Sequence, residues 1–461
     1  MSPLDYSYTF SDITERFCQV KIIDHNKGQA KGPIQVAIRD NSLLANANKR
    51  VPSLIADLMD VAIAISLADR MSIRRYDMPC RIKVDLPVRQ LEILSRPDIQ
   101  ERFQDILYWF TGDVWSINFT KHLGHNRISE MQLSFIEGDE YLTTVALWSG
   151  GLDALAGVYY QLSLNSTDHY TLFSTGSNFM IHKVQRDVAS VIKDMFPNRT
   201  QLIQIPFLLS KTRFYAKDSD LRTRGFVFIL LGSACAYLLG QSSLDVYENG
   251  VGAINLPFTR AEVGLDHSRS VHPLSLYNMS ELLSKLFERP FSIHNPFLFK
   301  TKAQMCGSLS LNGATDLIFR TVSCDRRHRK KPSQCGYCSS CLLRRQALAA
   351  QGIIDKTKYV ITSPSSGRRK SPEDSLPLRA MLSQVEDLRI LLNQADPWQS
   401  LSDSYSWLRE IIDRTCEKEG LTRQEMSMQL IHMYKSYVSE WDVAKHFIEP
   451  GLLSYEETVA G

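Results

Sequence analysis

Residues 144–155 of this chain, T-V-A-L-W-S-G-G-L-D-A-L, have types and a spacing that suit the binding of a phosphate. Val145 to Trp148 predict a buried strand, because apolar side chains would lie on both of its faces. Ser149-Gly150-Gly151 predict a tight turn, and helical periodicity runs from Leu152 to Leu164. The glycines let the backbone approach an anion closely, and the helix start offers unpaired N–H groups at the positive end of its dipole. We therefore expect an anion site at this turn.

Two side chains add chemistry that the backbone of the turn lacks. Ser149 supplies a hydroxyl donor. Asp153, in the first helical turn, can cap free N–H groups or hold a metal-bound water. The alternative interpretation is an ordinary turn between a strand and a helix.

Four of the nine cysteines cluster at metal-ligand spacing. Cys324, Cys335, Cys338 and Cys341 give the pattern C-x10-C-x2-C-x2-C, which suits tetrahedral Zn²⁺ in a structural site without an open position. The C-x2-C-x2-C run delivers three ligands from one tight turn, while the first cysteine arrives from the far side of a basic loop. An iron–sulfur cluster, which also takes four cysteines, is the competing interpretation. We expect zinc to clamp a loop beside a sheet.

The loop inside the cysteine pattern carries a run of positive charge. Its members are Arg326, Arg327, Arg329, Lys330 and Lys331. Such a run is usually a solvated surface, and the alternative is contact with RNA phosphates or an acidic partner. No interleaved aromatic residues support the stacking of single-stranded bases, so nucleic acid is not the favoured partner.

From residue 143 onward, strand and helix patterns alternate. Strands are expected at residues 145–148, 169–174, 201–207 and 244–247, and helices at 152–164, 182–196, 222–240 and 275–288. This alternation predicts a parallel, doubly wound α/β sheet, in which ligands bind at the carboxyl ends of the strands. Ser174-Thr175-Gly176-Ser177 and Glu248-Asn249-Gly250 sit at such ends, as does the S-G-G turn. We expect these three segments to converge on one crevice.

Further charged residues lie at the starts of later helices. Arg222 and Arg224 open a long apolar helix, where positive charge is unfavourable for the helix dipole and a bound anion would explain it. Solvated arginines are the alternative. Glu248 is a candidate substrate-binding carboxylate, although Asn-Gly after it also suits a simple turn. Lys302 could meet phosphate, but a lone lysine at a helix start is more often solvated.

The flanking regions carry no catalytic motif. Residues 1–140 predict an α+β accessory domain with at least one mostly antiparallel sheet, built on strand patterns at 19–23, 34–38, 81–86, 115–119 and 131–135 and a helix at 52–70. Residues 141–355 hold the motifs described above. A polar linker at 363–372 precedes a helical region, 375–461, with helices expected at 378–394, 401–417 and 423–447. We expect this tail to serve docking or oligomerisation.

Composition is that of an ordinary globular protein. Charged residues make up 22% and hydrophobic ones 44% of the 461 residues, and the net charge of +3 does not demand nucleic acid. The start of the chain shows no signal-peptide pattern. The most apolar stretch, 225–240, is short for a membrane span and contains glycine, serine and cysteine. Together with the absence of a disulfide pattern, this favours a cytoplasmic protein without membrane contact.

The S-G-G-x-D pattern resembles the pyrophosphate (PP) loop of the ATP pyrophosphatases, which split ATP into AMP and pyrophosphate to activate a substrate. With a four-cysteine cluster about 170 residues later, the chain is similar over residues 143–352 to the 7-cyano-7-deazaguanine synthase family, known as QueC. Ala154 stands where the PP loop usually has Ser or Thr, and the cysteine spacing is longer. The length resembles the enlarged QueC-like proteins of bacterial antiphage operons (QatC and its relatives in CBASS systems).

This resemblance implies an ATP- and Mg²⁺-dependent, AMP- and pyrophosphate-forming ligase that adenylates 7-carboxy-7-deazaguanine. In the enlarged proteins the implied acceptor is an amine of a partner protein, and in the smaller ones ammonia, which gives an amide and then a nitrile. It also implies catalytic roles for Ser149, Asp153 and Arg224 and a zinc site at the four cysteines. The residues expected to bind the nucleotide are Ser149, Gly150, Gly151, Leu152, Asp153, Ala154, Ser174, Thr175, Arg224 and Glu248.

Two other functions stay open on the sequence. One is tRNA modification such as thiolation, which needs a reactive cysteine near the nucleotide. Cys235 and Cys306 lie in helical, partly apolar surroundings that favour inert thiols. The other is a nucleotide-binding scaffold without turnover, for which Ala154 is the main argument.

Overall fold

A computed structural model of the chain describes residues 4–13, 18–39, 50–74, 79–127, 130, 143–210, 221–258, 269–325, 333–362 and 375–452. Three predicted features lie outside these ranges: the strand at 131–135, the linker at 363–372, and the basic run of Arg326, Arg327, Arg329, Lys330 and Lys331. Within the described ranges, no helix combines the length and apolar character needed to cross a membrane.

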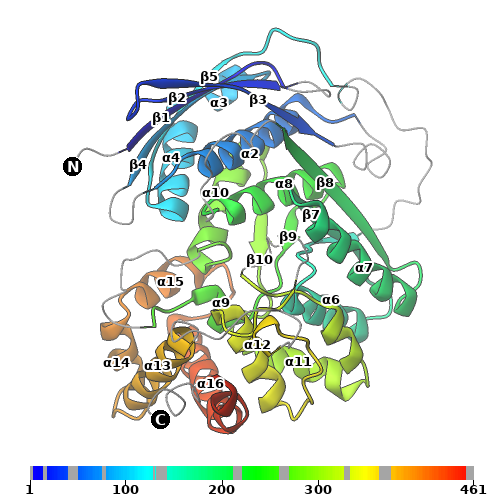
Figure 1. Ribbon diagram of the computed structural model, residues 1–461, viewed down its shortest axis with the longest axis vertical. Coiled ribbons are helices and arrows are strands. Elements are labelled where there is room, and N and C mark those ends of the chain that lie inside the picture. Colours follow the sequence, from blue (N-terminus) through cyan, green and yellow to red (C-terminus); the bar gives the residue numbers. More distant parts are fainter. Residues whose placement is uncertain are drawn as a thin grey trace.

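The centre of the molecule is a parallel sheet of five strands (Figure 1). The strands are β6 (Thr143–Leu147), β7 (His169–Gly176), β8 (Thr200–Ser210), β9 (Ser243–Asp245) and β10 (Ser292–His294). Their order across the sheet is β10-β9-β6-β7-β8, and each neighbouring pair is parallel. From β6 the chain adds β7 and β8 on one side and then β9 and β10 on the other, so the direction of the strand order reverses between β6 and β9. The predicted parallel α/β architecture is confirmed.

Helices cover both faces of this sheet. On one face, α6 (Leu152–Leu164), α7 (Phe179–Met195) and α11 (Lys302–Leu311) share a core with Ala146. On the other, α8 (Arg224–Leu238) and α10 (Pro273–Phe287) share a core with Val145. Neighbouring residues of β6 are thus buried against opposite layers, which explains why the strand is apolar throughout.

The N-terminal strands extend the same sheet rather than forming a separate one. They are β1 (Leu4–Phe10), β2 (Cys18–Asp24), β3 (Gln29–Ile38), β4 (Cys80–Val88) and β5 (Val114–Lys121). β3 pairs antiparallel with β8, with Val36 opposite Leu209, and so joins the two halves into ten strands. The N-terminal part is mixed, since β1–β2 and β2–β3 are antiparallel but β1–β4 and β4–β5 are parallel.

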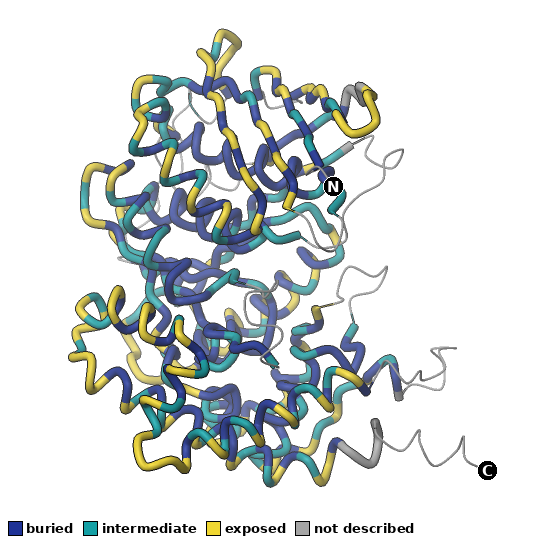
Figure 2. The backbone as a smooth tube through the Cα atoms, turned by 90° about the vertical axis from the view of Figure 1, so that its left-hand side faces the viewer, coloured by how far each residue is buried: buried dark blue, intermediate teal, exposed yellow. Residues whose placement is uncertain are grey.

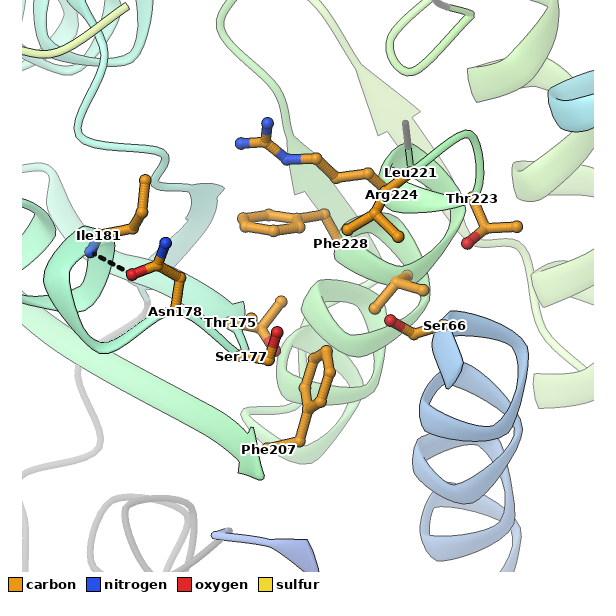
Figure 3. Close-up of a pocket in the computed structure, with 12 residues that line it drawn as sticks. Ser66, Thr175, Ser177, Asn178, Ile181, Phe207, Leu221, Thr223, Arg224 and Phe228 are labelled. Atoms are coloured by element: carbon orange, nitrogen blue, oxygen red, sulfur yellow. Dashed lines mark hydrogen bonds between the residues drawn. The ribbon is translucent and has the colours of Figure 1, made fainter. Parts of the chain in front are cut away.

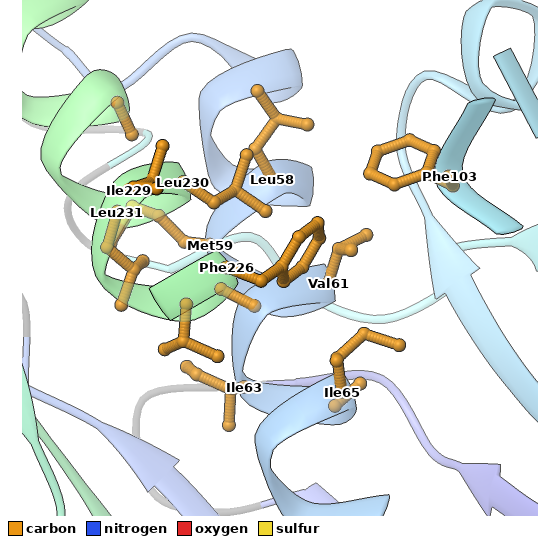
Figure 4. Packing of buried hydrophobic residues seen from close by; sticks show 14 of the residues in the cluster. Leu58, Met59, Val61, Ile63, Ile65, Phe103, Phe226, Ile229, Leu230 and Leu231 are labelled. Atoms are coloured by element: carbon orange, nitrogen blue, oxygen red, sulfur yellow. The ribbon is translucent and has the colours of Figure 1, made fainter. Parts of the chain in front are cut away.

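One face of the N-terminal strands is covered by α2 (Ser53–Met71) and α4 (Pro97–Thr111), with the short α3 (Leu91–Leu94) near β5. α2 is buried along almost its whole length because it lies between these strands and α8. Figure 4 shows the contact, with Phe226 of α8 among residues of α2 and close to Phe103 of α4. The N-terminal region and the parallel sheet therefore share one hydrophobic core.

The C-terminal region is helical, as predicted. It comprises α13 (Leu376–Leu392), α14 (Pro397–Ser404), α15 (Trp407–Thr415) and α16 (Arg423–Leu452). Two earlier helices, α9 (Gly250–Ile254) and α12 (Ser339–Ala350), lie next to this region. The single helix predicted at 401–417 is wrong, because the chain leaves helical geometry at Tyr405. These helices pack against α9 and α12 at the end of the molecule far from β1 (Figure 1), and Figure 2 shows buried residues continuing into them.

The packing of α6 on the end of β9 can be tested at one glycine. A Cβ atom added to Gly157 would lie 2.5 Å from Cβ and Cγ of Tyr247, which are the inflexible part of that side chain. We expect Gly157→Ala to lower the free energy of unfolding by about 1–3 kcal/mol, although alanine is the better helix former. The measurement is chemical denaturation of both proteins.

Gly307→Ala is the matched control, since Gly307 also lies inside a helix, α11. An added Cβ there would meet only the amide end of Gln351, at 3.3 Å. We expect this change to be neutral or stabilising. An equal loss of stability in both variants would contradict the packing described here.

Candidate functional site

The S-G-G turn joins β6 to α6 and places its backbone at the carboxyl edge of the sheet. Gly150 has a φ of +71°, a conformation that favours glycine, and Gly151 is the N-cap of α6. The Gly151 N–H donates to Ser149 Oγ at 3.2 Å. β6 lies beside β9, where the chain order reverses, so the turn opens on the crevice in which doubly wound sheets bind ligands.

Asp153 is the centre of a buried polar cluster at this crevice. One carboxylate oxygen, Oδ2, pairs with Lys302 Nζ, and both side chains are at least 90% buried. The other, Oδ1, accepts a hydrogen bond from Asn249 Nδ2 at 3.0 Å. The same Asn249 amide donates to Glu248 Oε1 at 2.7 Å. The prediction that Lys302 is solvated is wrong, because its ammonium group is the ion-pair partner that a buried Asp153 requires.

The charges in this cluster perturb one another. Burial raises the pKa of Glu248, and the neighbouring negative charge of Asp153 raises it further. Burial alone would lower the pKa of Lys302, but the two carboxylates outweigh that effect and raise it. Two carboxyl groups and one ammonium thus share a confined space, and the Lys302 ammonium can balance the charge of only one of the two carboxylates.

Arg224 lies in the first turn of α8, on the other side of the crevice. Among the described residues it forms no ion pair; its guanidinium carbon lies 5.6 Å from the centre of the Phe228 ring. Burial lowers the pKa of Arg224 to about 10, so the group stays charged at neutral pH. The charge of Asp325 opposes the effect of burial only in part, and a partly desolvated guanidinium that forms no ion pair is a favourable site for an anion.

Hydrogen bonds from the N-terminal region hold the start of α8. Asp69 of α2 accepts from both the backbone N–H and the hydroxyl of Thr223, at 2.9 and 2.7 Å. Arg222 donates to the carbonyl of Thr111 at 2.8 Å. Of the two arginines predicted to meet an anion, only Arg224 therefore lines the crevice, while Arg222 is engaged with the end of α4.

The crevice is a large chamber with an empty volume of about 1960 Å³, including the solvent at its mouth. Its lining includes Ser149, Gly151, Asp153, Ala154, Arg224, Glu248, Lys302 and Ser323, together with residues of the C-terminal helices. Most of the predicted nucleotide-binding residues thus lie on one surface. Gly150 and Leu152 are not among the lining residues, and their backbone groups bond to Val322 and Ser323.

A smaller, mainly apolar slot shares part of its lining with the chamber (Figure 3), with an empty volume of about 560 Å³ that includes the solvent at its opening. Thr175, Phe207 and Phe228 line it, and Arg224 borders both cavities. Ser66 of α2 closes one side, so the N-terminal region contributes to this slot as well. Ser174 is fully buried within β7 and is not among the residues that line either cavity.

The four cysteines come together as predicted. All four Sγ atoms lie within 4.8 Å of one another, with 3.9 Å between Cys324 and Cys338 and 3.8 Å between Cys335 and Cys341. A tetrahedron of sulfurs about 2.3 Å from one Zn²⁺ has edges of about 3.8 Å. The Cys335 Sγ also accepts the Cys338 backbone N–H at 3.2 Å. The cluster is compatible with one zinc ion and too small to enclose several irons.

The segment that leads into this cluster is bonded to the S-G-G turn. The Val322 N–H donates to the Gly150 carbonyl at 3.2 Å, and the Leu152 N–H donates to Ser323 Oγ at 3.0 Å. The strip of chain that leads into the cysteine cluster is therefore held against the S-G-G turn. The contact between Ser323 and the turn was not predicted from the sequence. The only indication was that Ser323 directly precedes the first cysteine of the cluster.

Part of the chain is similar in sequence to known proteins. Residues 274–352, which include Lys302 and all four cysteines, match the family model of Queuosine biosynthesis protein QueC. Three curated proteins named 7-cyano-7-deazaguanine synthase are similar. The protein of Acinetobacter baylyi is 27% identical over 139 residues, that of Methylobacillus flagellatus 28% over 146, and that of an Anaeromyxobacter species 34% over 140.

These matches cover 30–32% of this chain and 54–58% of the relatives. The chain thus spans just over half the length of the curated proteins that it matches. The findings support a QueC-like character for this part of the chain.

The metal site leads to a direct prediction. We expect the purified protein to carry about one zinc ion per chain, and Cys338→Ser to lose it, because three thiolates and a hydroxyl bind Zn²⁺ far less well. Cys416→Ser is the matched control, since Cys416 lies in the C-terminal region and outside the cluster. Elemental analysis of the three proteins gives the answer. Full zinc retention in Cys338→Ser, or bound iron in place of zinc, would contradict the assignment.

Proposed function

We propose that this protein adenylates a deazaguanine carboxylate, 7-carboxy-7-deazaguanine, with ATP and transfers the acyl group to an amine. The observation that carries the proposal is the chamber in which the S-G-G turn, Asp153, Glu248, Lys302 and Arg224 face the same space. Similarity to 7-cyano-7-deazaguanine synthases supplies the substrate class. ATP and the acid are the small-molecule partners of this proposal.

In this proposal the chamber binds the phosphates of ATP and the smaller slot binds its base. The phosphates lie against the turn, where the start of α6 and the positive charges of Arg224 and Lys302 balance their charge. The apolar slot at Thr175 suits the flat base, since Phe207 and Phe228 line it. Arg224 borders both cavities and so can contact the phosphate nearest the nucleoside. The chamber leaves room for a second small molecule beside the α-phosphate.

In the first step, a carboxylate oxygen of the substrate attacks the α-phosphorus, and the bond from that phosphorus to the bridging oxygen breaks. Pyrophosphate leaves with the electron pair, which gives an acyl adenylate. The Ser149 hydroxyl donates to the departing oxygens, and the Gly151 and Leu152 N–H groups do so when they exchange their bonds to the Ser149 and Ser323 hydroxyls. Lys302 exchanges its ion pair with Asp153 for the phosphate oxygens, and Arg224 stabilises the charge on phosphorus.

Asp153 and Glu248 fit a Mg²⁺ ion. Magnesium is usually held by one or two carboxylates together with substrate phosphates, and Asn249 holds these two carboxylates in one hydrogen-bonded group. Burial, and then the negative charge of Asp153, raise the pKa of Glu248, and a cation beside both carboxylates would favour its ionised form. When bound, Mg²⁺ would neutralise charge on the leaving pyrophosphate.

In the second step, an amine nitrogen attacks the acyl carbon, and AMP leaves with the electron pair of the C–O bond. The nitrogen loses its proton, and an amide results. We propose that the amine belongs to a partner protein and that this modification serves bacterial antiphage defence, as the resemblance to the enlarged QueC-like proteins implies. Residues 141–355 would form the catalytic unit, and residues 1–140 and 375–461 would be accessory regions that also receive the partner.

Two features bear on the competing functions. Cys235 and Cys306 are fully buried, and burial raises the pKa of Cys306 to about 12, which leaves no reactive thiolate there for thiolation. Ala154 removes one hydroxyl from the turn, but Ser323 brings another to the Leu152 N–H. Ammonia as the acceptor is the second candidate, because the curated relatives are named 7-cyano-7-deazaguanine synthases.

Asp153 gives the sharpest test of the site. We expect Asp153→Asn to reduce pyrophosphate release at least about a hundredfold, because it removes a charge on which Lys302 and the cation both depend. Asp187→Asn, on an exposed position of α7, is the control and should match the unchanged protein. Thermal unfolding and zinc content show whether each variant is folded. Unchanged turnover in folded Asp153→Asn would reject the assignment of the site.

The acceptor can be identified by mass spectrometry. The protein, ATP, Mg²⁺ and 7-carboxy-7-deazaguanine are incubated first with ammonia and then with proteins encoded by neighbouring genes. A deazaguanine-sized mass on a protein is the expected result. An amide or nitrile from ammonia, with no modified protein, would mark a small-molecule synthase. ATP binding without pyrophosphate release in either arm would indicate a scaffold.

A further inference from the structure

One wall of the chamber comes from the C-terminal helices. Met381 and Gln384 of α13 and Tyr434 and Tyr437 of α16 line the same space as the S-G-G turn. These residues lie beyond residue 352, where the match to the QueC family model ends. The C-terminal region is thus part of the chamber, and not only a surface for docking.

Hydrogen bonds lock this wall to the catalytic elements. Glu440 of α16 accepts from the hydroxyl of Thr301 at 2.5 Å and from the amide of Gln346 at 2.9 Å. Thr301 is the N-cap of α11 and directly precedes Lys302, so α16 also helps to place that ammonium group. Gln384 donates to the carbonyls of Leu256 and Pro257, both at 2.9 Å. The wall is therefore held in a defined position.

Tyr434 stands out within the wall. Its side chain is only 1% exposed, and its hydroxyl has no hydrogen-bond partner among the described residues. Burial raises the pKa of Tyr434 well above its usual value, so the hydroxyl keeps its proton and can donate. A buried hydroxyl without a partner is costly, and such groups in native structures usually serve a ligand or an ordered water.

The chemistry of the wall indicates which end of a ligand it receives. Met381, Gln384, Tyr434 and Tyr437 carry no charge, whereas Arg224, Lys302, Asp153 and Glu248 lie on other parts of the lining. Phosphate and carboxylate groups therefore belong near the turn and the charged cluster. The neutral wall, aromatic with one free hydroxyl, suits the polar edge of a flat heterocycle.

We propose that Tyr434 is a specificity-determining residue whose hydroxyl donates a hydrogen bond to the heterocycle of the acid substrate. Gln384 and Tyr437 complete the surface against which that ring lies. This inference rests on the function proposed above and assigns the ring end of the substrate to helices that the QueC match does not include. The carboxylate end then extends from the wall toward the α-phosphate.

The test is Tyr434→Phe, which removes one oxygen and keeps the ring. We expect the KM for 7-carboxy-7-deazaguanine in pyrophosphate release to rise about tenfold, because the bound heterocycle loses a buried hydrogen bond. The KM for ATP should stay unchanged. The thermal midpoint should not fall, since the hydroxyl has no partner in the free protein. Tyr159→Phe, a buried tyrosine of α6 that does not line the chamber, is the control and should alter neither KM.

The possible results distinguish a failure of the Tyr434 assignment from a failure of the proposed function. Turnover by the unchanged protein with an unaltered KM for the acid in Tyr434→Phe would overturn this assignment and leave the proposed function standing. A raised KM for the amine acceptor alone would overturn it as well, since the wall would then receive the acceptor. No turnover by the unchanged protein with this acid would reject the proposed function together with the assignment.

Discussion

The buried ion pair between Asp153 and Lys302 is the constraint on which the site depends. A carboxylate at the start of α6, taken out of water, requires a partner, and the ammonium group at the start of α11 supplies it. The pair draws together two helices on one face of the sheet, and Asn249 connects it to the end of β9. The elements around the crevice are therefore held by charge as well as by apolar packing.

Three outer parts of the molecule support this centre through specific contacts. The N-terminal region holds the start of α8 through Asp69 and so places Arg224. The cysteine cluster fixes Ser323 against the anion-binding turn. The C-terminal helix α16 bonds to Thr301, next to Lys302. The C-terminal helices also supply part of the chamber lining, so a region without a catalytic motif takes part in shaping the site.

The features that sequence predicted best are local ones. The strand, glycine turn and helix around Ser149 lie within a dozen residues, and three of the four cysteines fall within seven. The position of Arg224 at the start of an apolar helix was likewise visible in one stretch of chain. What the sequence did not predict depends on long-range contact. Lys302 is 149 positions from Asp153, and β3 joins β8 across the two halves of the sheet. Periodicity and spacing carry no signal for such pairings. The burial of the Tyr434 hydroxyl without a partner among the described residues is likewise a result of folding that the sequence does not reveal.

Attack of the acid on the α-phosphorus of ATP is tested most directly by following one oxygen atom of its carboxyl group. If the acid attacks the α-phosphorus, a carboxylate oxygen becomes the bridge of the acyl adenylate and leaves in AMP when the amine attacks. The reaction is run with 7-carboxy-7-deazaguanine labelled with oxygen-18 in its carboxyl group, and the AMP is analysed by mass spectrometry. If the acid attacks in this way, the phosphate of AMP will carry one labelled oxygen. ADP as the product, or AMP without label, would contradict this mechanism.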